Sequence, residues 1–253
     1  MVTSARDRPG RDTMIEIRIH GRGGQGGVTL AKLIATSRFL QGLSVQAFGL
    51  YAAERSGAPI QAFCRYSKDT ITNRNLIYEP DHVIVLDPTL VGPTIVAGLK
   101  AGGWILINSP QSPADFAQAF SHNRIATVDA TSIAVRHGLG SRTVPIVNTA
   151  LAGAAARLLD MSLESVLAAF DEFGFHGGNE RAAREAWDAI RTQKGAPLPG
   201  AARASTPPPP PRRPGLVSGN TGDPPAIHTG QWANQQPLRE NQTPPCNFIC
   251  PAG

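Results

Sequence analysis

The sequence predicts a three-layer α/β fold around a mostly parallel sheet, followed by a proline-rich tail. Apolar segments with strand periodicity alternate with helical segments along residues 14–194, as they do in α/β domains. Residues 83–86 and 104–107 are uninterrupted apolar runs, which is typical of strands buried on both faces of a parallel sheet. Of the 22 prolines, 14 follow residue 195, and such a stretch cannot easily form a packed core.

This composition divides the 253 residues into four parts. The first part, residues 1–13, has no apolar pattern, and Met14, which follows it, is an alternative start to Met1. The third part, residues 195–245, contains five consecutive prolines, which favour a disordered, partly polyproline II linker. The predicted parts are a disordered extension at 1–13, one domain at 14–194, a proline-rich linker at 195–245 and a short CxxxCP segment at 246–253.

The domain begins with a strand, a glycine turn and a helix. Ile15, Ile17 and Ile19 alternate with polar residues, and this period of two predicts a strand. Five glycines in the seven residues 21–27 exclude a regular element there. Apolar residues from Val28 onward then recur at helical spacing. Such a unit presents backbone N–H groups at a helix start, either to an anion or to a close-packed neighbour.

The remaining elements continue the alternation. Gly42 favours the end of the first helix. Gly153 and the alanines around it suit close packing against another helix or another subunit. The expected strands cover 45–48, 60–66, 83–86, 104–109 and 124–128, and the expected helices cover 147–159, a segment beginning at Ser162, and 179–190.

Asp87 directly follows a predicted strand, at the edge of the sheet where ligands of open α/β folds gather. We favour a structural role over a catalytic one, with the side chain capping the segment after Pro88. The six histidines are scattered, and no Ser/His/Asp or paired-carboxylate arrangement indicates a catalytic centre. The sequence therefore predicts no catalytic residue and no metal ligand in this chain.

The glycine turn matches the spacing GxGxxG from Gly21 to Gly26 but lacks the other marks of a dinucleotide site. No acidic residue stands about 20 positions further on, where only Gln46 is a polar candidate for a ribose contact. The absence of Gly-Lys-Ser/Thr excludes a P-loop. Two interpretations stay open: a contact to a phosphate-bearing ligand, and a surface that packs against another chain.

Two motifs together resemble a known family. GRGGQGGVTLAKLIA begins at Gly21, and YAAERSGA begins at Tyr51. Both are similar to segments of the gamma subunit, or gamma domain, of 2-oxoacid:acceptor oxidoreductases of the pyruvate:ferredoxin type, and the similarity extends over about residues 14–193. That family has G-x-G-G-Q-G-G in the first motif and Y-G-x-E-x-R-G-G in the second. The second motif departs from this pattern at Ala52 and is compressed after Glu54.

The resemblance implies a Rossmann-like domain that acts as a non-autonomous subunit of an oxidoreductase. Enzymes of this family decarboxylate a 2-oxoacid such as pyruvate on thiamine diphosphate, pass electrons through iron–sulfur clusters and release the acyl group to coenzyme A (CoA). Thiamine diphosphate, Mg²⁺ and [4Fe–4S] clusters are then expected in partner subunits of alpha, beta and delta type. Ferredoxin or an NAD(P)-linked subunit is the expected acceptor.

By the same resemblance, this chain contributes subunit contacts and part of the surface that faces CoA. The alternative is a stand-alone Rossmann-like nucleotide-binding or regulatory domain. The cofactor-binding residues that the two motifs imply are Gly21, Gly23, Gly24, Gln25, Gly26, Gly27, Tyr51, Glu54 and Arg55.

The last ten residues, PPCNFICPAG, resemble the opening of the iron–sulfur segment of glutamate synthase small-subunit-type proteins. Cys246 and Cys250 alone cannot supply the four thiolates of a [4Fe–4S] cluster. The segment is therefore either the truncated start of a fused domain or a degenerate remnant, and no metal is assigned to it.

Composition excludes other classes of function. Residues 14–195 contain 17 Lys and Arg against 15 Asp and Glu, without a basic run interleaved with aromatic residues, so a nucleic acid partner is not expected. No apolar run approaches the roughly 18–20 residues of a membrane span. The N-terminus lacks the apolar segment of a signal peptide. We therefore expect a cytoplasmic protein that does not associate with membranes.

Overall fold

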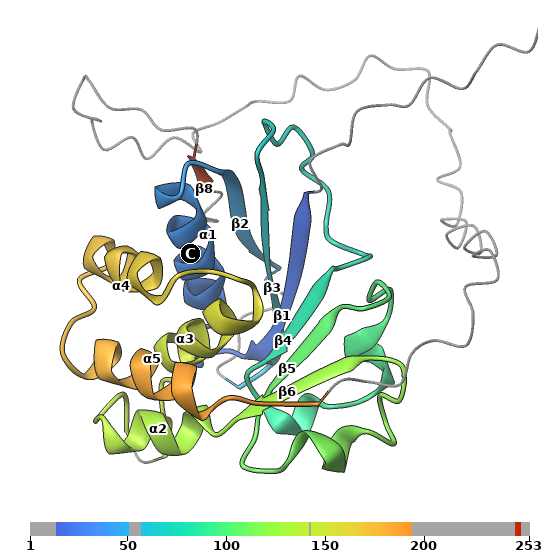
Figure 1. Ribbon diagram of the computed structural model, residues 1–253, viewed down its shortest axis with the longest axis vertical. Coiled ribbons are helices and arrows are strands. Elements are labelled where there is room, and N and C mark those ends of the chain that lie inside the picture. The colour runs from blue at the N-terminus through green and yellow to red at the C-terminus, as the bar shows by residue number, and fades with distance from the viewer. Residues whose placement is uncertain (1–13, 51–56, 142, 194–245, 249–253) are drawn as a thin grey trace, which may run out of the picture. The chain divides into compact units, whose positions relative to one another are not determined.

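A computed structural model describes residues 14–50, 57–141 and 143–193 in full and residues 246–248 as backbone. The described part forms an α/β fold around one sheet (Figure 1). The expectations that lie outside the described residues are the extension at 1–13, the linker at 195–245, the end of the CxxxCP segment, and the motif residues Tyr51, Glu54 and Arg55. These expectations stay predictions.

The sheet of the described part has eight strands in the order β7-β6-β5-β4-β1-β3-β2-β8. Four neighbouring strands, β1, β4, β5 and β6, run parallel, with Ile19 of β1 aligned with Ile84 of β4. The strands are β1 (Ile15–Arg22), β2 (Ser44–Leu50), β3 (Pro59–Ser67), β4 (His82–Val85), β5 (Trp104–Asn108), β6 (Arg124–Val128), β7 (Arg191–Gln193) and β8 (Cys246–Phe248).

One central strand, β3, runs against this direction. It lies antiparallel between β1 and β2, where Cys64 is opposite both Ile17 and Ala47. The connection from Leu50 to Pro59 is shorter than the dozen or so residues that a parallel crossover needs, so β3 returns directly beside β2. At the other edge, β7 is also antiparallel to its neighbour. The mostly parallel sheet is confirmed, with these two exceptions.

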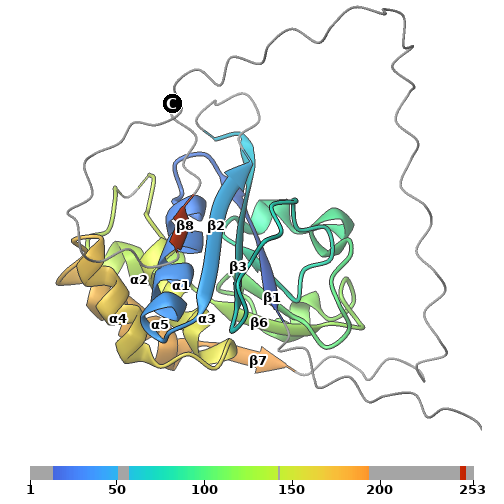
Figure 2. The same cartoon turned by 90° about the horizontal axis from the view of Figure 1, so that it is seen from above.

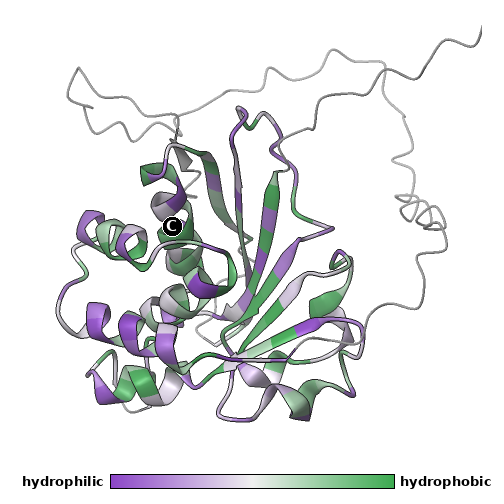
Figure 3. Ribbon diagram, viewed as in Figure 1, coloured by the Kyte–Doolittle hydropathy of each residue, from purple (hydrophilic) through white to green (hydrophobic). Residues whose placement is uncertain are grey.

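The α-helices of the described part cover one face of the sheet (Figure 2). α1 packs on β2 and β3, α3 packs on α1, and α5 packs on α3. Polar colours gather on the outer helices such as α5, while β4 and β5 are mostly apolar (Figure 3). None of the described helices is both long and apolar enough to cross a bilayer. The helices are α1 (Gly27–Leu40), α2 (Ala130–Arg136), α3 (Asn148–Leu158), α4 (Leu163–Glu172) and α5 (Gly178–Ala189).

α3 and α5 approach each other closely at Gly153. A Cβ at this position would lie 2.1 Å from the carbonyl oxygen of Ala183, so only glycine fits. Ala182 and Ala186 of α5 are buried beside this contact. The sequence left open whether the small residues around Gly153 pack on a helix or on another subunit. In the structure they pack on α5 of the same chain.

The opposite face of the sheet is covered by short 3-10 helices, each of which begins at a proline. A second apolar core lies beneath them, formed by alternate residues of β4 and β5 such as Val85 and Ile107 together with Ile95 and Phe116. The three layers are therefore confirmed, although 3-10 helices replace α-helices in the connections between β4, β5 and β6. The short helices are η1 (Pro88–Leu90), η2 (Pro93–Val96) and η3 (Pro113–Phe116).

Arg65 of β3 is the largest fully buried side chain and fixes a loop to the sheet. Its Nη1 donates hydrogen bonds to Gln46 Oε1 (3.0 Å) and Asn73 O (2.7 Å), and its Nη2 donates to Asn75 O (2.6 Å). Its Nε lies 3.2 Å from Oε1 of Glu16 on β1. Burial raises the pKa of Glu16, an effect that the charge of Arg65 partly offsets.

Replacing Arg65 with methionine should destabilise the fold by about 3–5 kcal/mol, because Glu16 and the loop carbonyls would lose their partner in the interior. Urea unfolding of the full chain measures the change in free energy. The matched control is Arg74→Met, which removes an exposed arginine from the same loop and should change stability by less than about 0.5 kcal/mol. Equal effects of the two substitutions would contradict the role given to Arg65.

Candidate functional site

The candidate site lies where β1 ends and α1 begins, at the carboxyl end of the parallel strands. Gly24 and Gly26 have φ angles of 94° and 81°, a left-handed conformation that favours glycine. The Gln25 N–H donates to Arg22 O over 3.1 Å and closes the turn. The first motif therefore forms the strand, turn and helix that its sequence predicted.

Gln25 turns its side chain into the turn. Its Oε1 accepts a hydrogen bond from Arg22 N (2.8 Å), and its Nε2 donates to Asp87 Oδ2 (3.2 Å). Gly21 lies directly beneath, where an added Cβ would be 3.3 Å from Gln25 Oε1. The unusual glutamine of the motif thus ties the end of β1 to the residues that follow β4.

Asp87 accepts hydrogen bonds from the end of β1 and from η1. It accepts from Arg22 Nε (2.9 Å), Thr89 N (2.9 Å) and Thr89 Oγ1 (2.6 Å). Burial raises the pKa of Asp87, but the hydrogen bonds from Thr89 and Gln25 and the charge of Arg22 outweigh that effect, and the pKa lies below its ordinary value. Asp87 is therefore an ionised cap of η1. This confirms the structural role that the sequence favoured.

The end of the second motif is attached to the glycine turn. Gly23 N donates to Ala58 O (2.9 Å), and Gly57 N donates to Gly23 O (3.2 Å). Arg22 Nη1 also donates to Gly57 O (3.1 Å). Tyr51, Glu54 and Arg55 are outside the described residues, but the segment that carries them is joined to the turn at Gly57 and Ala58.

The turn has a packed side and an open side. An added Cβ at Gly26 would lie 2.6 Å from Asn148 Nδ2 at the start of α3, and one at Gly27 would lie 3.3 Å from Ile60 Cδ1. At Gly24, which is exposed, an added Cβ would meet no atom of the described residues within 4 Å. Packing within the chain thus explains Gly26 and Gly27, and the left-handed backbone explains Gly24, whose outer side is not covered by described residues.

The N-terminus of α1 has no partner among the described side chains. Its N-cap, Gly26, has no side chain, and the first turn of α1 holds no acidic residue. The N–H groups of Gly27, Val28 and Thr29 have no acceptor within the helix, as in the first turn of any α-helix. These groups and the helix dipole favour an anion at this end of α1.

A cavity of about 400 Å³ lies beside the turn, between the ends of β1, β2 and β3 and the 3-10 helices. Sequence analysis did not identify it, because its lining comes from five separate elements. The only feature of the sequence that pointed to this cavity was the polar pair Arg18 and His20, in a strand that is covered on both faces. The lining residues are His20, Leu50, Pro59, Ile60, Gln61, Leu90, Thr94 and Ile95.

His20 is the buried ionisable group of this cavity, with 7% of its surface exposed. Arg18 Nε donates to His20 Nε2 over 3.1 Å, which leaves the ring proton on Nδ1. Burial, and then the charge of Arg18, lowers the pKa of His20 to about 4. The imidazole is therefore neutral near pH 7. Arg18 itself donates to Ile95 O (3.0 Å) and Ala97 O (2.6 Å).

The buried His20 should make the protein less stable in mild acid. A base whose pKa falls from about 6.5 to about 4 on folding contributes stability above pH 6.5, which is lost as the pH falls towards 4. Between pH 7.5 and 5.0 the wild type should lose about 2 kcal/mol more than His20→Gln, measured by urea unfolding. Exposed His122→Gln is the control and should follow the wild type. Parallel curves for wild type and His20→Gln would contradict the neutral, buried state.

Residues 16–191 match the model of the family described as pyruvate ferredoxin/flavodoxin oxidoreductase. The pyruvate/ketoisovalerate oxidoreductases common subunit gamma of Pyrococcus abyssi is 43% identical over 182 residues, which cover 69% of this chain and 96% of that protein. The pyruvate synthase subunit PorC of Methanocaldococcus jannaschii is 46% identical over 155 residues, or 60% of this chain and 82% of that one.

Solved structures agree with this result. The pyruvate oxidoreductase subunit PORC of Thermotoga maritima has 32% sequence identity and a TM-score of 0.63, over 72% of this chain and 99% of that chain. The 2-oxoglutarate:ferredoxin oxidoreductase of Magnetococcus marinus, at 19% identity and a TM-score of 0.53 over 69% of this chain and 30% of that one, is similar in fold alone. The resemblance found in the two sequence motifs is thereby confirmed, and this chain belongs to the pyruvate ferredoxin/flavodoxin oxidoreductase family.

Proposed function

We propose that this chain is the gamma subunit of a thiamine-diphosphate-dependent 2-oxoacid:ferredoxin oxidoreductase that transfers the acyl group to CoA. Two named relatives, a common subunit gamma and a PorC, support the subunit type. The matched region extends over 96% of the Pyrococcus abyssi subunit, so the likeness concerns a whole subunit rather than a shared fragment. In this proposal the reaction takes place in a complex of alpha, beta, gamma and delta-type subunits in the cytoplasm.

The oxidative chemistry belongs to partner subunits in this proposal. Decarboxylation needs thiamine diphosphate with Mg²⁺ as electron sink, and electron transfer needs [4Fe–4S] clusters held by four thiolates each. This chain has three cysteines. Cys64 is fully buried, and burial raises the pKa of its thiol to about 12, so it is neither a ligand nor a nucleophile near neutral pH. Cys246 and Cys250 leave a cluster two thiolates short.

The single observation that carries a CoA-facing role is the open side of the glycine turn. Among the described residues, no atom lies within 4 Å of a Cβ added at Gly24, and no side chain caps the positive end of α1. The second motif ends at Gly57 and Ala58, which are hydrogen-bonded to Gly23 of the same turn. A phosphate or diphosphate of CoA fits this combination of a helix dipole and first-turn N–H groups that no described side chain caps. The adjoining cavity at His20 is mainly apolar and suits an uncharged part of the same ligand.

The alternative, a stand-alone dinucleotide-binding domain, has less support. Gln46, the one polar candidate for a ribose contact, is 3% exposed, and its Oε1 accepts a hydrogen bond from Arg65. Its side chain is therefore committed inside the fold. The motif also implied a ligand contact for Gln25. Both the oxygen and the nitrogen of its side-chain amide instead form hydrogen bonds within the chain, to Arg22 and Asp87. We assign it the task of shaping the turn for the glycines that remain open.

Gly24→Ala should weaken CoA use without dissociating the complex. The methyl group enters open space, and the cost of the left-handed backbone is about 1–2 kcal/mol. Blocking one N–H contact to a phosphate should raise the apparent KM for CoA by about tenfold in steady-state kinetics of the assembled enzyme. Gly26→Ala is the matched variant. Its methyl group collides with Asn148, so it should lower the melting temperature of the free chain.

Size-exclusion chromatography of the complex distinguishes the two interpretations of the turn, a contact to a phosphate of CoA and a contact to a partner subunit. Loss of the complex in Gly24→Ala, with a folded free chain, would show that the open side packs against a partner. An unchanged KM for CoA and an intact complex would show that neither role is correct.

The isolated chain should have no oxidoreductase activity and should bind thiamine diphosphate no better than background. Purified chain is mixed with pyruvate, CoA, thiamine diphosphate, Mg²⁺ and ferredoxin, and reduction of ferredoxin is followed by absorbance. Activity should appear only when the thiamine-binding subunits are added, and the gamma chain should then co-purify with them. Turnover by the chain alone would overturn the subunit assignment.

A further inference from the structure

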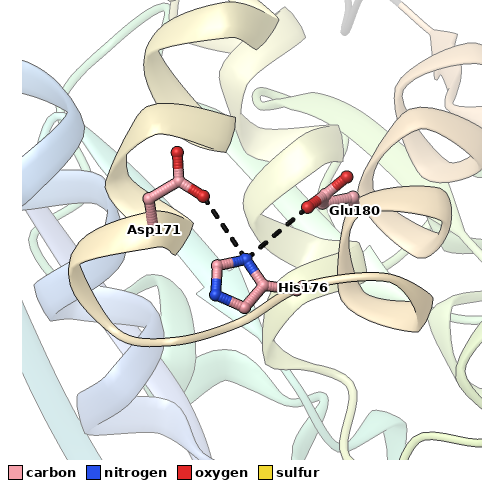
Figure 4. A group of neighbouring side chains, drawn as sticks. All are labelled: Asp171, His176 and Glu180. Atoms are coloured by element: carbon pink, nitrogen blue, oxygen red, sulfur yellow. Dashed lines mark ion pairs between the residues drawn. The ribbon is translucent and has the colours of Figure 1, made fainter.

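Three potential metal ligands converge at the corner between α4 and α5 (Figure 4). His176 lies in the turn that joins the two helices, Asp171 lies in the last turn of α4, and Glu180 lies in the first turn of α5. His176 Nδ1 is 3.4 Å from Asp171 Oδ1 and 3.8 Å from Glu180 Oε1. The three ligand atoms all lie within 4.8 Å of one another.

The backbone of this corner is held firmly although its side chains are exposed. Phe175 N donates to Phe170 O (2.9 Å), and Asn179 N donates to His176 O (3.3 Å). The rings of Phe173 and Phe175 stack with centroids 6.0 Å apart and pack against the main core. The Cα positions of the three ligands are therefore fixed by the fold, while their side chains can turn.

The carboxylates at this corner favour the binding of a cation. Asp171 and Glu172 end α4, where the helix dipole is negative, and the last turn of α4 holds no basic residue. Among the described residues, His176 is the only ion-pair partner of either Asp171 or Glu180. The corner therefore brings two carboxylates together with a ring nitrogen that can also act as a metal ligand.

We propose that Asp171, His176 and Glu180 form a zinc-type site that clamps α4 to α5. Zn²⁺ binds imidazole nitrogen and carboxylate oxygen at about 2.0–2.2 Å, which places neighbouring ligand atoms about 3.3–3.5 Å apart in a tetrahedron. The 3.4 Å pair already has this spacing. Glu180, whose side chain is 39% exposed, must turn to shorten its 3.8 Å distance to His176 and its distance to Asp171, which lies within 4.8 Å. Water completes the fourth position.

The ligand set selects the class of metal. Imidazole nitrogen favours Zn²⁺, Co²⁺ and Ni²⁺ over Ca²⁺ and Mg²⁺, which prefer an all-oxygen shell. A metal bound here would stabilise the fold, because it crosslinks the end of one helix to the start of the next. It requires no change in the backbone, and it is independent of the glycine turn and of CoA.

Metal binding to the full chain tests the proposal. Cys246 and Cys250 are first replaced by serine, since their thiols could also bind zinc. The metal-free Cys246→Ser/Cys250→Ser protein is titrated with ZnCl₂ by calorimetry and with CoCl₂ by visible absorption. One equivalent of Zn²⁺ should bind, Co²⁺ should give the intense absorption of a tetrahedral site, and Zn²⁺ should raise the melting temperature.

Single substitutions in the same background assign the ligands. His176→Ala should abolish binding and the zinc-dependent rise in melting temperature. Glu180→Gln should weaken binding at least about tenfold, the usual cost of disturbing a metal site. His122→Ala, which removes another exposed histidine, should bind as its parent does. No binding in the serine background, or binding that survives His176→Ala, would overturn the proposal and leave the three residues as an ion-pair cluster.

Discussion

The hydrogen bonds that converge on Asp87 connect the glycine turn to the sheet, and the geometry of the candidate site depends on them. Arg22 and Gln25 reach Asp87 from the end of β1, while Thr89 reaches it from η1. A turn with several glycines has little intrinsic preference for one conformation. Side chains that bond to a fixed carboxylate supply that preference, so the open backbone at Gly24 is presented by a rigid support.

The two faces of the sheet are built by different means. The face beneath the α-helices is filled by aliphatic residues and alanines, and α3 and α5 meet backbone to backbone at Gly153. The face beneath the 3-10 helices contains the buried guanidinium groups of Arg18 and Arg65. Each of these donates to backbone carbonyls of the segments that cross this face. Buried donors need partners, so these arginines hold irregular backbone where no helix could do so.

In the proposed function, these features determine which steps of the reaction this chain serves and which its partner subunits perform. The chain offers N–H groups, a helix dipole and a small cavity with the neutral imidazole of His20, and these suit binding and orientation of a ligand. Its Cys64 thiol is buried in the core, and its ionised Asp87 caps η1, so both groups have structural roles. Under that proposal, the subunit holds the acyl acceptor while metal and thiamine chemistry proceed on its partners.

Local sequence determined the elements and the family. Ile15, Ile17 and Ile19 gave the first strand because side chains alternate in an extended chain, and Gln25 among glycines identified the motif. The structural role of Asp87 was also predictable, since an aspartate before a proline is a natural helix cap. The sequence could not reveal that β3 lies between β1 and β2 in the sheet, or that Gly26 packs on Asn148. Nor could it place the cavity at His20 or the corner at His176. These features join residues far apart in the chain or set the orientation of side chains, and only the packing of the whole fold decides either.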